Sequence, residues 1–507
     1  MIYLSKSKYC GLWQCPKIAW LRMYKPEEAL IDANTQARFD AGNVVGDLAM
    51  GLFGDFVEVT TFDGDKLDLT AMISKTAEEM EKGTLNICEA SFSYEGLYCA
   101  VDILRKDGDG WAIYEVKSST KHMEDDGSYT DDKEVYIADI AYQKYVLEHL
   151  GVNVTGTYLV CINGDYVFDG TLDLNKLFFI SDVADEIPAE TVKIEPNLAL
   201  AERILNSTLE PDIDLDVHCK KPYLCAFWDF CSRHLPDESV FNLYRMPMTK
   251  KIGYYRQGLI SYRDLLENAD NLNEKQIRQI EYALEDKGTY VNKVEIATYL
   301  QGLTYPLYFL DFETMQPVIP QFIGTKPYAQ IPFQYSLHYI EEEGGELKHK
   351  EFLAESGEDP RRAIAESLCE NIPMNVCVTA YYKAFECTRI KELAETFPDL
   401  AEHLLNIRDN IVDLLVPFQS GWYYNHAMGG SFSIKSVLPA IFPDDPSLNY
   451  HNLEGVHNGS EAMTIFPKIK DMPPEEAQKA RHNLLKYCEL DTYAMVKVWE
   501  ELKRVAE

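Results

Sequence analysis

A short turn sequence between two apolar runs is the feature that most restricts how this chain can fold. Residues 98–106 and 111–118 are mostly apolar and flank Asp-Gly-Asp-Gly at residues 107–110. Asp-Gly between two such runs is a strong β-hairpin signal. With the turn centred between Gly and Asp, Asp102 faces Glu115 across the hairpin. Directly opposed side chains approach to about 5 Å.

The predicted hairpin gathers two carboxylates and one ammonium group on one face. Glu115 and Lys117 are two residues apart on one strand, so their side chains point the same way. Two facing carboxylates repel each other unless a cation lies between them, and an all-oxygen site suits Mg²⁺ or Mn²⁺. Lys117 is a candidate catalytic residue because its ammonium can orient water or stabilise phosphate charge. The alternative is an ordinary solvated hairpin face.

A helical segment at residues 140–150 adds a further candidate. Its periodicity places Gln143 on the apolar face of Ile140, Leu147 and Leu150. A buried amide needs a hydrogen-bond partner, and the carboxylate site is one candidate for that partner. Ordinary helix packing is the alternative.

Three of the 12 cysteines are evenly spaced in an aromatic segment, at Cys219, Cys225 and Cys231. The first residues have no apolar segment typical of a secretory signal, and no apolar run is long enough to span a bilayer. We therefore expect a cytoplasmic protein, in which clustered cysteines indicate metal binding. Cys10 or Cys15 is the candidate fourth ligand. Three ordinary buried cysteines are the alternative.

A second acidic group lies in the C-terminal part. The apolar strand at residues 305–314 contains Asp311 and Glu313, which alternation places on one face. Burying two charges side by side is costly unless a metal neutralises them.

Two predicted helices direct further polar groups inward. Residues 483–499 form an amphipathic helix whose apolar stripe contains Asp491, with Tyr487 one turn earlier. In the helix that follows residue 383, Glu386 shares a face with apolar residues. The four carboxylates would hold two metal ions, which clamp the attacking and leaving oxygens of a phosphodiester. Tyr487 would position the attacking water.

Charge and length restrict the partners and the domain organisation. The 507 residues include 48 Lys and Arg against 82 Asp and Glu, for a net charge of −34. This balance argues against passive binding to nucleic-acid phosphates or to an anionic membrane. A nucleic-acid groove would have to be a local basic or metal-filled patch. Three regions are predicted, at residues 1–232, 233–300 and 301–507, the middle one a helical connector.

The N-terminal motifs resemble a known nuclease family. Asp102, Glu115-Val-Lys117 and Gln143, with Cys15-Pro-Lys and the three later cysteines, resemble PD-(D/E)XK nucleases of the RecB type, in particular Cas4-like and AddB-type proteins. The resemblance implies a mixed sheet with helices and metal ligation by Asp102 and Glu115. It also implies that Lys117 and Gln143 act in the site. It further implies a [4Fe–4S] cluster, with Zn²⁺ as the alternative, held by Cys15, Cys219, Cys225 and Cys231.

The C-terminal motifs resemble a second family. Asp311-Phe-Glu313 and Tyr487-x-x-x-Asp491 resemble the DEDD exonucleases of the RNase H-like fold. The resemblance implies that Asp311, Glu313, Glu386 and Asp491 are metal ligands. Relatives usually have Asn-x-x-Phe-Asp where this chain has Tyr-Lys-Ala-Phe-Glu386. The whole chain resembles bacterial proteins that join a Cas4-like region to a DUF2779 region, and residues 327–338 are typical of the latter.

The sequence therefore predicts an α/β protein with two nuclease-like domains, the second RNase H-like. We expect metal-dependent hydrolysis of DNA or RNA, exonucleolytic, with single-stranded DNA favoured and Mg²⁺ or Mn²⁺ as cofactor. One alternative is a single active site, with the other domain only gripping nucleic acid. Another is a non-enzymatic assembly protein whose acidic surface binds a basic partner.

Overall fold

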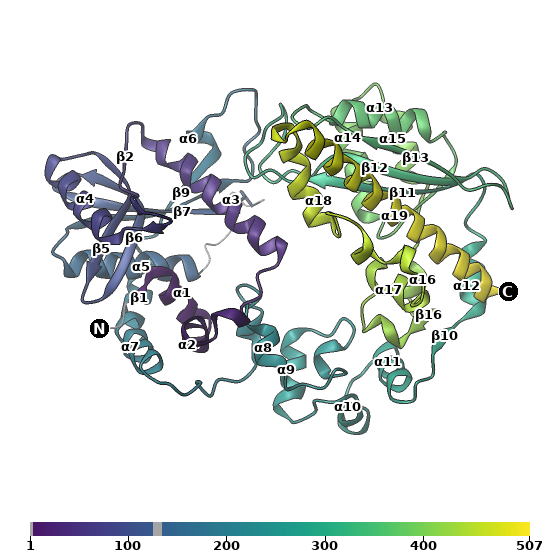
Figure 1. The fold of residues 1–507 in the computed structure, drawn as a ribbon, viewed down its shortest axis with the longest axis horizontal. Coiled ribbons are helices and arrows are strands. Elements are labelled where there is room, and N and C mark those ends of the chain that lie inside the picture. Colours follow the sequence, from purple (N-terminus) through teal and green to yellow (C-terminus); the bar gives the residue numbers. More distant parts are fainter. Residues whose placement is uncertain (1–3, 125–133) are drawn as a thin grey trace. The chain divides into compact units, whose positions relative to one another are not determined.

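The computed structural model describes residues 4–124 and 134–507 and has an α/β fold (Figure 1). The chain forms two compact units. The first comprises residues 1–234 and 317–328, and the second comprises residues 235–316 and 329–507. The segment 233–300, predicted as a connector, thus belongs to the second unit from residue 235 onward. No helix in the described ranges combines the length and apolarity needed to cross a bilayer.

The first unit is built on a seven-stranded sheet of order β2-β5-β6-β7-β8-β9, with β1 paired to β6. Strands β6 and β7 form the predicted hairpin: Asp107 pairs with Gly110 and Ile103 with Tyr114. This register confirms the turn position derived from the sequence. The strands are β1 (Leu4–Ser5), β2 (Val57–Glu58), β5 (Asn86–Tyr94), β6 (Leu97–Asp107), β7 (Gly110–Lys121), β8 (Val154–Asn163) and β9 (Phe178–Asp182), with a separate hairpin of β3 (Phe62–Asp63) and β4 (Lys66–Leu67).

Alternation along β7 separates two apolar cores on the two faces of this sheet. Ile113 lies in a core shared with α1, α5 and α7, whereas Ala112 and Tyr114 lie in a core shared with α3 and α6. Glu115 and Lys117 have the parity of Ile113, so they project toward the α5 side. The helices are α1 (Lys6–Gln14), α2 (Pro16–Tyr24), α3 (Ala33–Ala49), α4 (Leu69–Lys82), α5 (Glu134–His149), α6 (Leu174–Leu177), α7 (Ile187–Leu205) and α8 (Trp228–Ser232).

The second unit contains a five-stranded sheet of order β13-β12-β11-β14-β15. Strand β12 runs antiparallel to β11 and β13, and β14 and β15 run parallel to β11. The acidic strand is therefore the central one. The strands are β11 (Leu307–Met315), β12 (Ile331–Ile340), β13 (Lys348–Leu353), β14 (Cys377–Ala380) and β15 (Ile411–Asp413).

Alternation along β11 decides which helices face its carboxylates. Tyr308, Leu310 and Phe312 pack against α13, α14 and α15 on one face. On the other face Phe309 contacts Trp499 of α19, so Asp311 and Glu313 project toward α19. Helices on the two faces are α13 (Arg361–Asn371), α14 (Ala384–Thr396), α15 (Ala401–Asp409), α18 (Gly459–Ile465) and α19 (Pro474–Ala506).

Helix α19 carries the apolar stripe predicted from the sequence. Leu484, Cys488, Met495, Val498 and Leu502 are all buried, and Asp491 is buried among them. The inward position of this carboxylate is therefore confirmed.

The remaining part of the second unit has a small core of its own, around Val240, Tyr262 and Ile280. Two of its helices, α10 and α11, begin at Tyr262 and Glu274, in agreement with the helical character predicted for residues 233–300. Its elements are α9 (Met248–Arg256), α10 (Tyr262–Asn268), α11 (Glu274–Leu284), β10 (Thr289–Val291), α12 (Lys293–Leu300), α16 (Val416–Gln419), β16 (Tyr423–Asn425) and α17 (Ile434–Ile441).

Candidate active site

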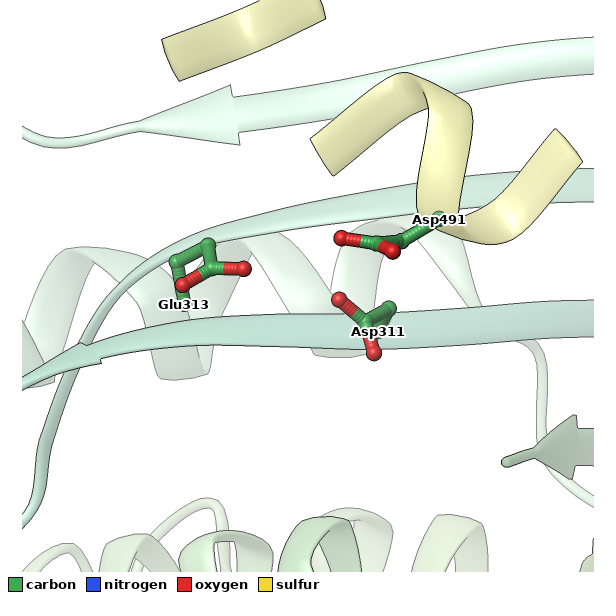
Figure 2. A group of neighbouring side chains, drawn as sticks. All are labelled: Asp311, Glu313 and Asp491. Atoms are coloured by element: carbon green, nitrogen blue, oxygen red, sulfur yellow. The ribbon is translucent and has the colours of Figure 1, made fainter. Parts of the chain in front are cut away.

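Three carboxylates meet between β11 and α19. Ligand oxygens of Asp311, Glu313 and Asp491 all lie within 4.8 Å of one another. Figure 2 shows the first two on the strand and Asp491 reaching down from the helix. Asp491 and Glu313 are each 7 % exposed, so the group is largely shielded from water.

The carboxylates in this group resist ionisation. Burial, followed by repulsion from its acidic neighbours, holds the pKa of Asp311 well above its usual range. Glu313 is affected in the same way, and burial raises the pKa of Asp491 to about 6. Lys435 lowers all three pKa values but does not cancel the effect of burial. An inserted cation would remove this electrostatic penalty.

Two tyrosines and a lysine line the group on one side. The Tyr450 hydroxyl donates a hydrogen bond of 2.6 Å to Asp491. Lys435 donates one of 3.1 Å to the Tyr487 hydroxyl, and its ammonium lies 5.1 Å from the centre of each tyrosine ring. Burial raises the pKa of Tyr487, so its phenol stays protonated and can donate a hydrogen bond.

Glu386 lies nearby but outside the close group. It is 3 % exposed and shares the buried face of α14 with Ile390 and Leu393, as the sequence predicts. Burial raises the pKa of Glu386 to about 8. Its Oε2 atom is buried and has no hydrogen-bond partner among the described residues. A buried, unpartnered carboxylate oxygen is rare in proteins and is available to a ligand.

Comparison with known protein families bears on this site. Residues 308–433 match the family described as Domain of unknown function (DUF2779). The match confirms the predicted DUF2779 resemblance for this segment, and it contains Asp311, Glu313 and Glu386 but ends before Asp491. No curated protein matches the chain.

The N-terminal acidic group lies outside the DUF2779 match and already contains a cation. The Lys6 ammonium, at the start of α1, lies 2.9 Å from Glu115 Oε1 and 3.3 Å from Asp102 Oδ1. Asp102 Oδ2 accepts a 2.7 Å hydrogen bond from the Val116 backbone. Counted outward from the turn, the last paired residue of β6 is Ile103, which pairs with Tyr114. Asp102 lies one position beyond this last pair. The Lys6 ammonium thus lies between the two carboxylates, in the position where a metal cation is predicted from the sequence.

Lys117 and Gln143 converge on the same carboxylate. Lys117 Nζ lies 2.5 Å from Glu115 and 2.8 Å from Asp139, and Gln143 Nε2 donates a 2.7 Å hydrogen bond to Glu115. Burial and repulsion from Asp102 oppose ionisation of Glu115, but Lys117 and Lys6 outweigh them and its pKa is lowered. The two lysines therefore compensate Glu115, although burial and repulsion from Glu115 raise the pKa of Asp139.

The four predicted cysteine ligands line one cavity of about 270 Å³ in the first unit. Cys15 lies between α1 and α2, and a 2.9 Å backbone hydrogen bond from Cys225 to Cys219 closes the loop before α8. Burial raises the pKa of all four thiols, and repulsion from neighbouring cysteines adds to this effect at Cys15, Cys219 and Cys231. Cys10 is not among the lining residues; it lies on α1, where Asp139 and Lys117 act on it.

The spacing of the sulfurs separates the two candidate cofactors. Tetrahedral zinc with four thiolates needs sulfurs about 3.8 Å apart, because its Zn–S bonds are about 2.3 Å. In the described part of the chain, no three cysteine sulfurs come within 4.8 Å of one another. The cavity also exceeds by far the roughly 30 Å³ that one water occupies in the liquid. The cavity leaves room for a group larger than a single ion.

Sequence reasoning missed three residues of these sites. Asp139 lies one turn before Gln143 on α5, and that spacing was a usable signal. Lys6 and Tyr450 reach their sites only through tertiary contacts, and nothing in their local sequence indicates them. Leu150, expected on the Gln143 face, instead lies past the end of α5 and is exposed.

Proposed function

We propose that the protein is a metal-dependent nuclease that hydrolyses phosphodiester bonds, with Asp311, Glu313 and Asp491 as its centre. One observation carries the proposal: the buried Glu313 and Asp491 and the half-buried Asp311 have carboxylate oxygens within 4.8 Å of one another, and Lys435 does not offset the cost of their burial. Such a group is costly as it stands and becomes favourable once it holds divalent metal.

The donor set fits Mg²⁺ or Mn²⁺, which prefer oxygen ligands. Asp311, Glu313 and Asp491 would hold one ion, and Glu386, with its unpartnered oxygen, is the candidate ligand for a second. When bound, the metal polarises the phosphodiester and lowers the pKa of bound water. This arrangement agrees with the resemblance to DEDD exonucleases.

Lys435 and Tyr487 supply the non-metal functions. Because the Tyr487 oxygen accepts a hydrogen bond from Lys435, its own O–H is directed away from the ammonium and toward Asp491, where it would be placed to hold a water or a phosphate oxygen at the metal site. Lys435 adds positive charge beside the site, where negative charge grows during hydrolysis.

The N-terminal group is the second candidate centre. The convergence of Lys117 and Gln143 on Glu115 favours it and agrees with the resemblance to PD-(D/E)XK nucleases. Lys6 would have to leave its position between Asp102 and Glu115 before a metal could bind both. The compensated charge of this group ranks it behind the C-terminal centre.

For the cysteine cavity we propose a [4Fe–4S] cluster rather than zinc, on the sulfur spacing and the volume given above. Protein purified without oxygen should absorb visible light and contain iron and acid-labile sulfide. Cys15→Ser should lose the absorption, whereas the control Cys10→Ser should keep it. A colourless protein with stoichiometric zinc would overturn this assignment.

The substrate class is nucleic acid, with single-stranded DNA favoured on the family resemblance. The test is degradation of end-labelled single- and double-stranded DNA and RNA with Mg²⁺ or Mn²⁺. Asp311→Asn should lower the rate about 100-fold or more, since a metal ligand is lost. The control Glu343→Gln, on an exposed turn, should leave the rate unchanged.

The outcomes separate the remaining candidates. Loss of activity in Lys117→Ala, with full activity in Asp311→Asn, would move the centre to the N-terminal group. Absence of degradation on every substrate would overturn the nuclease proposal and favour an assembly protein with a basic partner.

A further inference from the structure

Three basic side chains converge on one loop of the second unit, away from both acidic groups. Lys275 Nζ donates a 2.7 Å hydrogen bond to the Gln419 carbonyl, and Arg278 donates one of 2.6 Å to the Gly421 carbonyl. The Arg245 guanidinium lies 2.9 and 3.0 Å from the Gln419 side-chain oxygen in its favourable amide orientation. The three cations come from a turn before α9 and from the first turns of α11.

The charge of this group is not balanced by carboxylates. Within the described ranges, none of Arg245, Lys275 and Arg278 forms an ion pair with Asp or Glu, and their partners are neutral oxygens. The pKa of Lys275 is lowered by burial and then by repulsion from the two arginines. In a chain of net charge −34, three clustered cations without acidic partners leave local positive charge for a ligand.

Two of these cations, Arg245 and Lys275, border an open cleft of about 740 Å³. Its lining includes Tyr244, Arg245, Asn273, Glu274, Lys275 and Ser420. The cleft offers both arginine and lysine donors to phosphate oxygens and an aromatic ring at the same surface. One carboxylate, Glu274, is present, so the net charge of the lining stays positive.

Side-chain contacts connect the wall of the cleft with the proposed nuclease centre. Tyr244 packs on Phe432 with ring centroids 4.3 Å apart. Phe432 is three residues before Lys435, so their Cα atoms are at most about 11 Å apart. Lys435 in turn contacts Tyr487 beside the three carboxylates. Tyr244 of the cleft and Tyr487 of the centre are therefore connected through Phe432 and Lys435.

We propose that this cleft binds the phosphodiester backbone of a single nucleic-acid strand and delivers that strand to the Asp311, Glu313 and Asp491 centre. The proposal rests on the proposed nuclease function and names where that function holds its substrate. Lys275 and Arg245 contact backbone phosphates, and Tyr244 offers a ring to a base. Arg278, whose guanidinium lies 3.7 Å from the Tyr290 ring centre, holds the loop in place.

The test uses the full chain carrying Asp311→Asn, in EDTA, so that binding is measured without cleavage. The probes are a fluorescent 20-nucleotide single-stranded DNA, the matching RNA, and inorganic phosphate as competitor. Removing both contacts in Arg245→Gln/Lys275→Gln should weaken oligonucleotide binding at least 10-fold. It should also reduce the slope of log K against log[salt] by about 1.4, since each phosphate contact to a single strand contributes about 0.7.

Matched variants separate a binding role from loss of folding. Lys391→Gln/Lys468→Gln removes the same charge from exposed positions elsewhere in the unit and should change neither quantity. Arg245→Lys/Lys275→Arg keeps the charge and should retain binding. Ser420→Glu adds a carboxylate to the cleft without removing any of the three hydrogen bonds and should weaken binding. The thermal unfolding midpoint of each variant reports folding.

Each result decides the proposal. Unchanged affinity and salt slope in both Arg245→Gln/Lys275→Gln and Ser420→Glu would overturn it, even if the nuclease activity is real. The proposal would also be overturned, in favour of a small-anion site, by two results together. These are full competition by millimolar phosphate and an oligonucleotide affinity no higher than that of phosphate itself. Lost binding in the cleft variants would support it even if no degradation were observed.

Discussion

At the scale of single residues, the two acidic groups differ in what balances their charge. In the N-terminal group Lys6 and Lys117 lower the pKa of Glu115. In the C-terminal group the pKa values of Asp311, Glu313 and Asp491 are all raised. The same residue type is therefore ionised in one site and poised to release a proton in the other. Metal binding to the C-terminal group should release protons.

The raised pKa values predict how stability depends on pH without metal. Asp491 titrates near 6 and Glu386 near 8 in the folded chain, above the roughly 4 expected when unfolded. The contribution of these two groups to folding stability is fully present at a pH below their pKa in the unfolded chain. It is lost as the pH rises through 6 to 8. Asp491→Asn should therefore gain stability relative to wild type between pH 5 and 8 in EDTA, measured by urea unfolding. A difference that does not change with pH would contradict this.

Lys6 gives a second prediction, because it occupies the place of a metal. Lys6→Met should lower the unfolding midpoint in EDTA, since Asp102 then loses its ion pair and Glu115 keeps only Lys117 as a near cation. Added Mn²⁺ should raise the unfolding midpoint of Lys6→Met by more than it raises the midpoint of the wild type. The control is Lys8→Met, at an exposed position on the same helix. An equal Mn²⁺ response in Lys6→Met and wild type would show that the vacated position binds no metal.

At the scale of elements, local patterns predicted the hairpin, the acidic strand and the long helix. The Asp-Gly turn determines the β6–β7 register, and period-two alternation places Asp311 and Glu313 on one side of β11. The 3.6-residue period places Asp491 within the buried stripe of α19. These signals are local, so a single sequence carries them.

Contacts between distant segments were not predictable in the same way. Lys6 meets Glu115 across 109 positions, and Tyr450 meets Asp491 across 41. No local period or turn signal encodes such pairings. The same holds for the basic cleft, whose cations lie more than 140 positions from the loop that they hold.

Helix α19 supports the acidic centre through its buried stripe, and this predicts a stability cost. Met495→Ala, at a position with 0 % exposure, should lower the free energy of unfolding by about 2–5 kcal/mol. Glu500→Ala, on the exposed side of the helix, should change it by less than about 0.5 kcal/mol. Denaturant unfolding measures both. Equal effects would contradict the packing of this helix.

At the scale of the whole molecule, two units with separate cores predict two unfolding events. The first unit holds the cysteine cavity and the second the three-carboxylate group. In calorimetry, Mn²⁺ at 100 times its dissociation constant should stabilise one transition by about 2.7 kcal/mol. Cys231→Ser should lower the midpoint temperature of the other transition. A single transition that shifts both on addition of Mn²⁺ and in Cys231→Ser would contradict independent unfolding of the two units.

The division into units also has a consequence for how the chain can be cut. Residues 317–328 leave β11, join the first unit and return to β12. There Val318 is buried in its core and the Tyr328 hydroxyl donates a 2.6 Å hydrogen bond to the Ser118 carbonyl. The two units are interleaved in the gene, because one supplies an insert to the other. No single break in the polypeptide yields both units intact, so a truncation made between residues 234 and 317 removes a segment that the first unit needs.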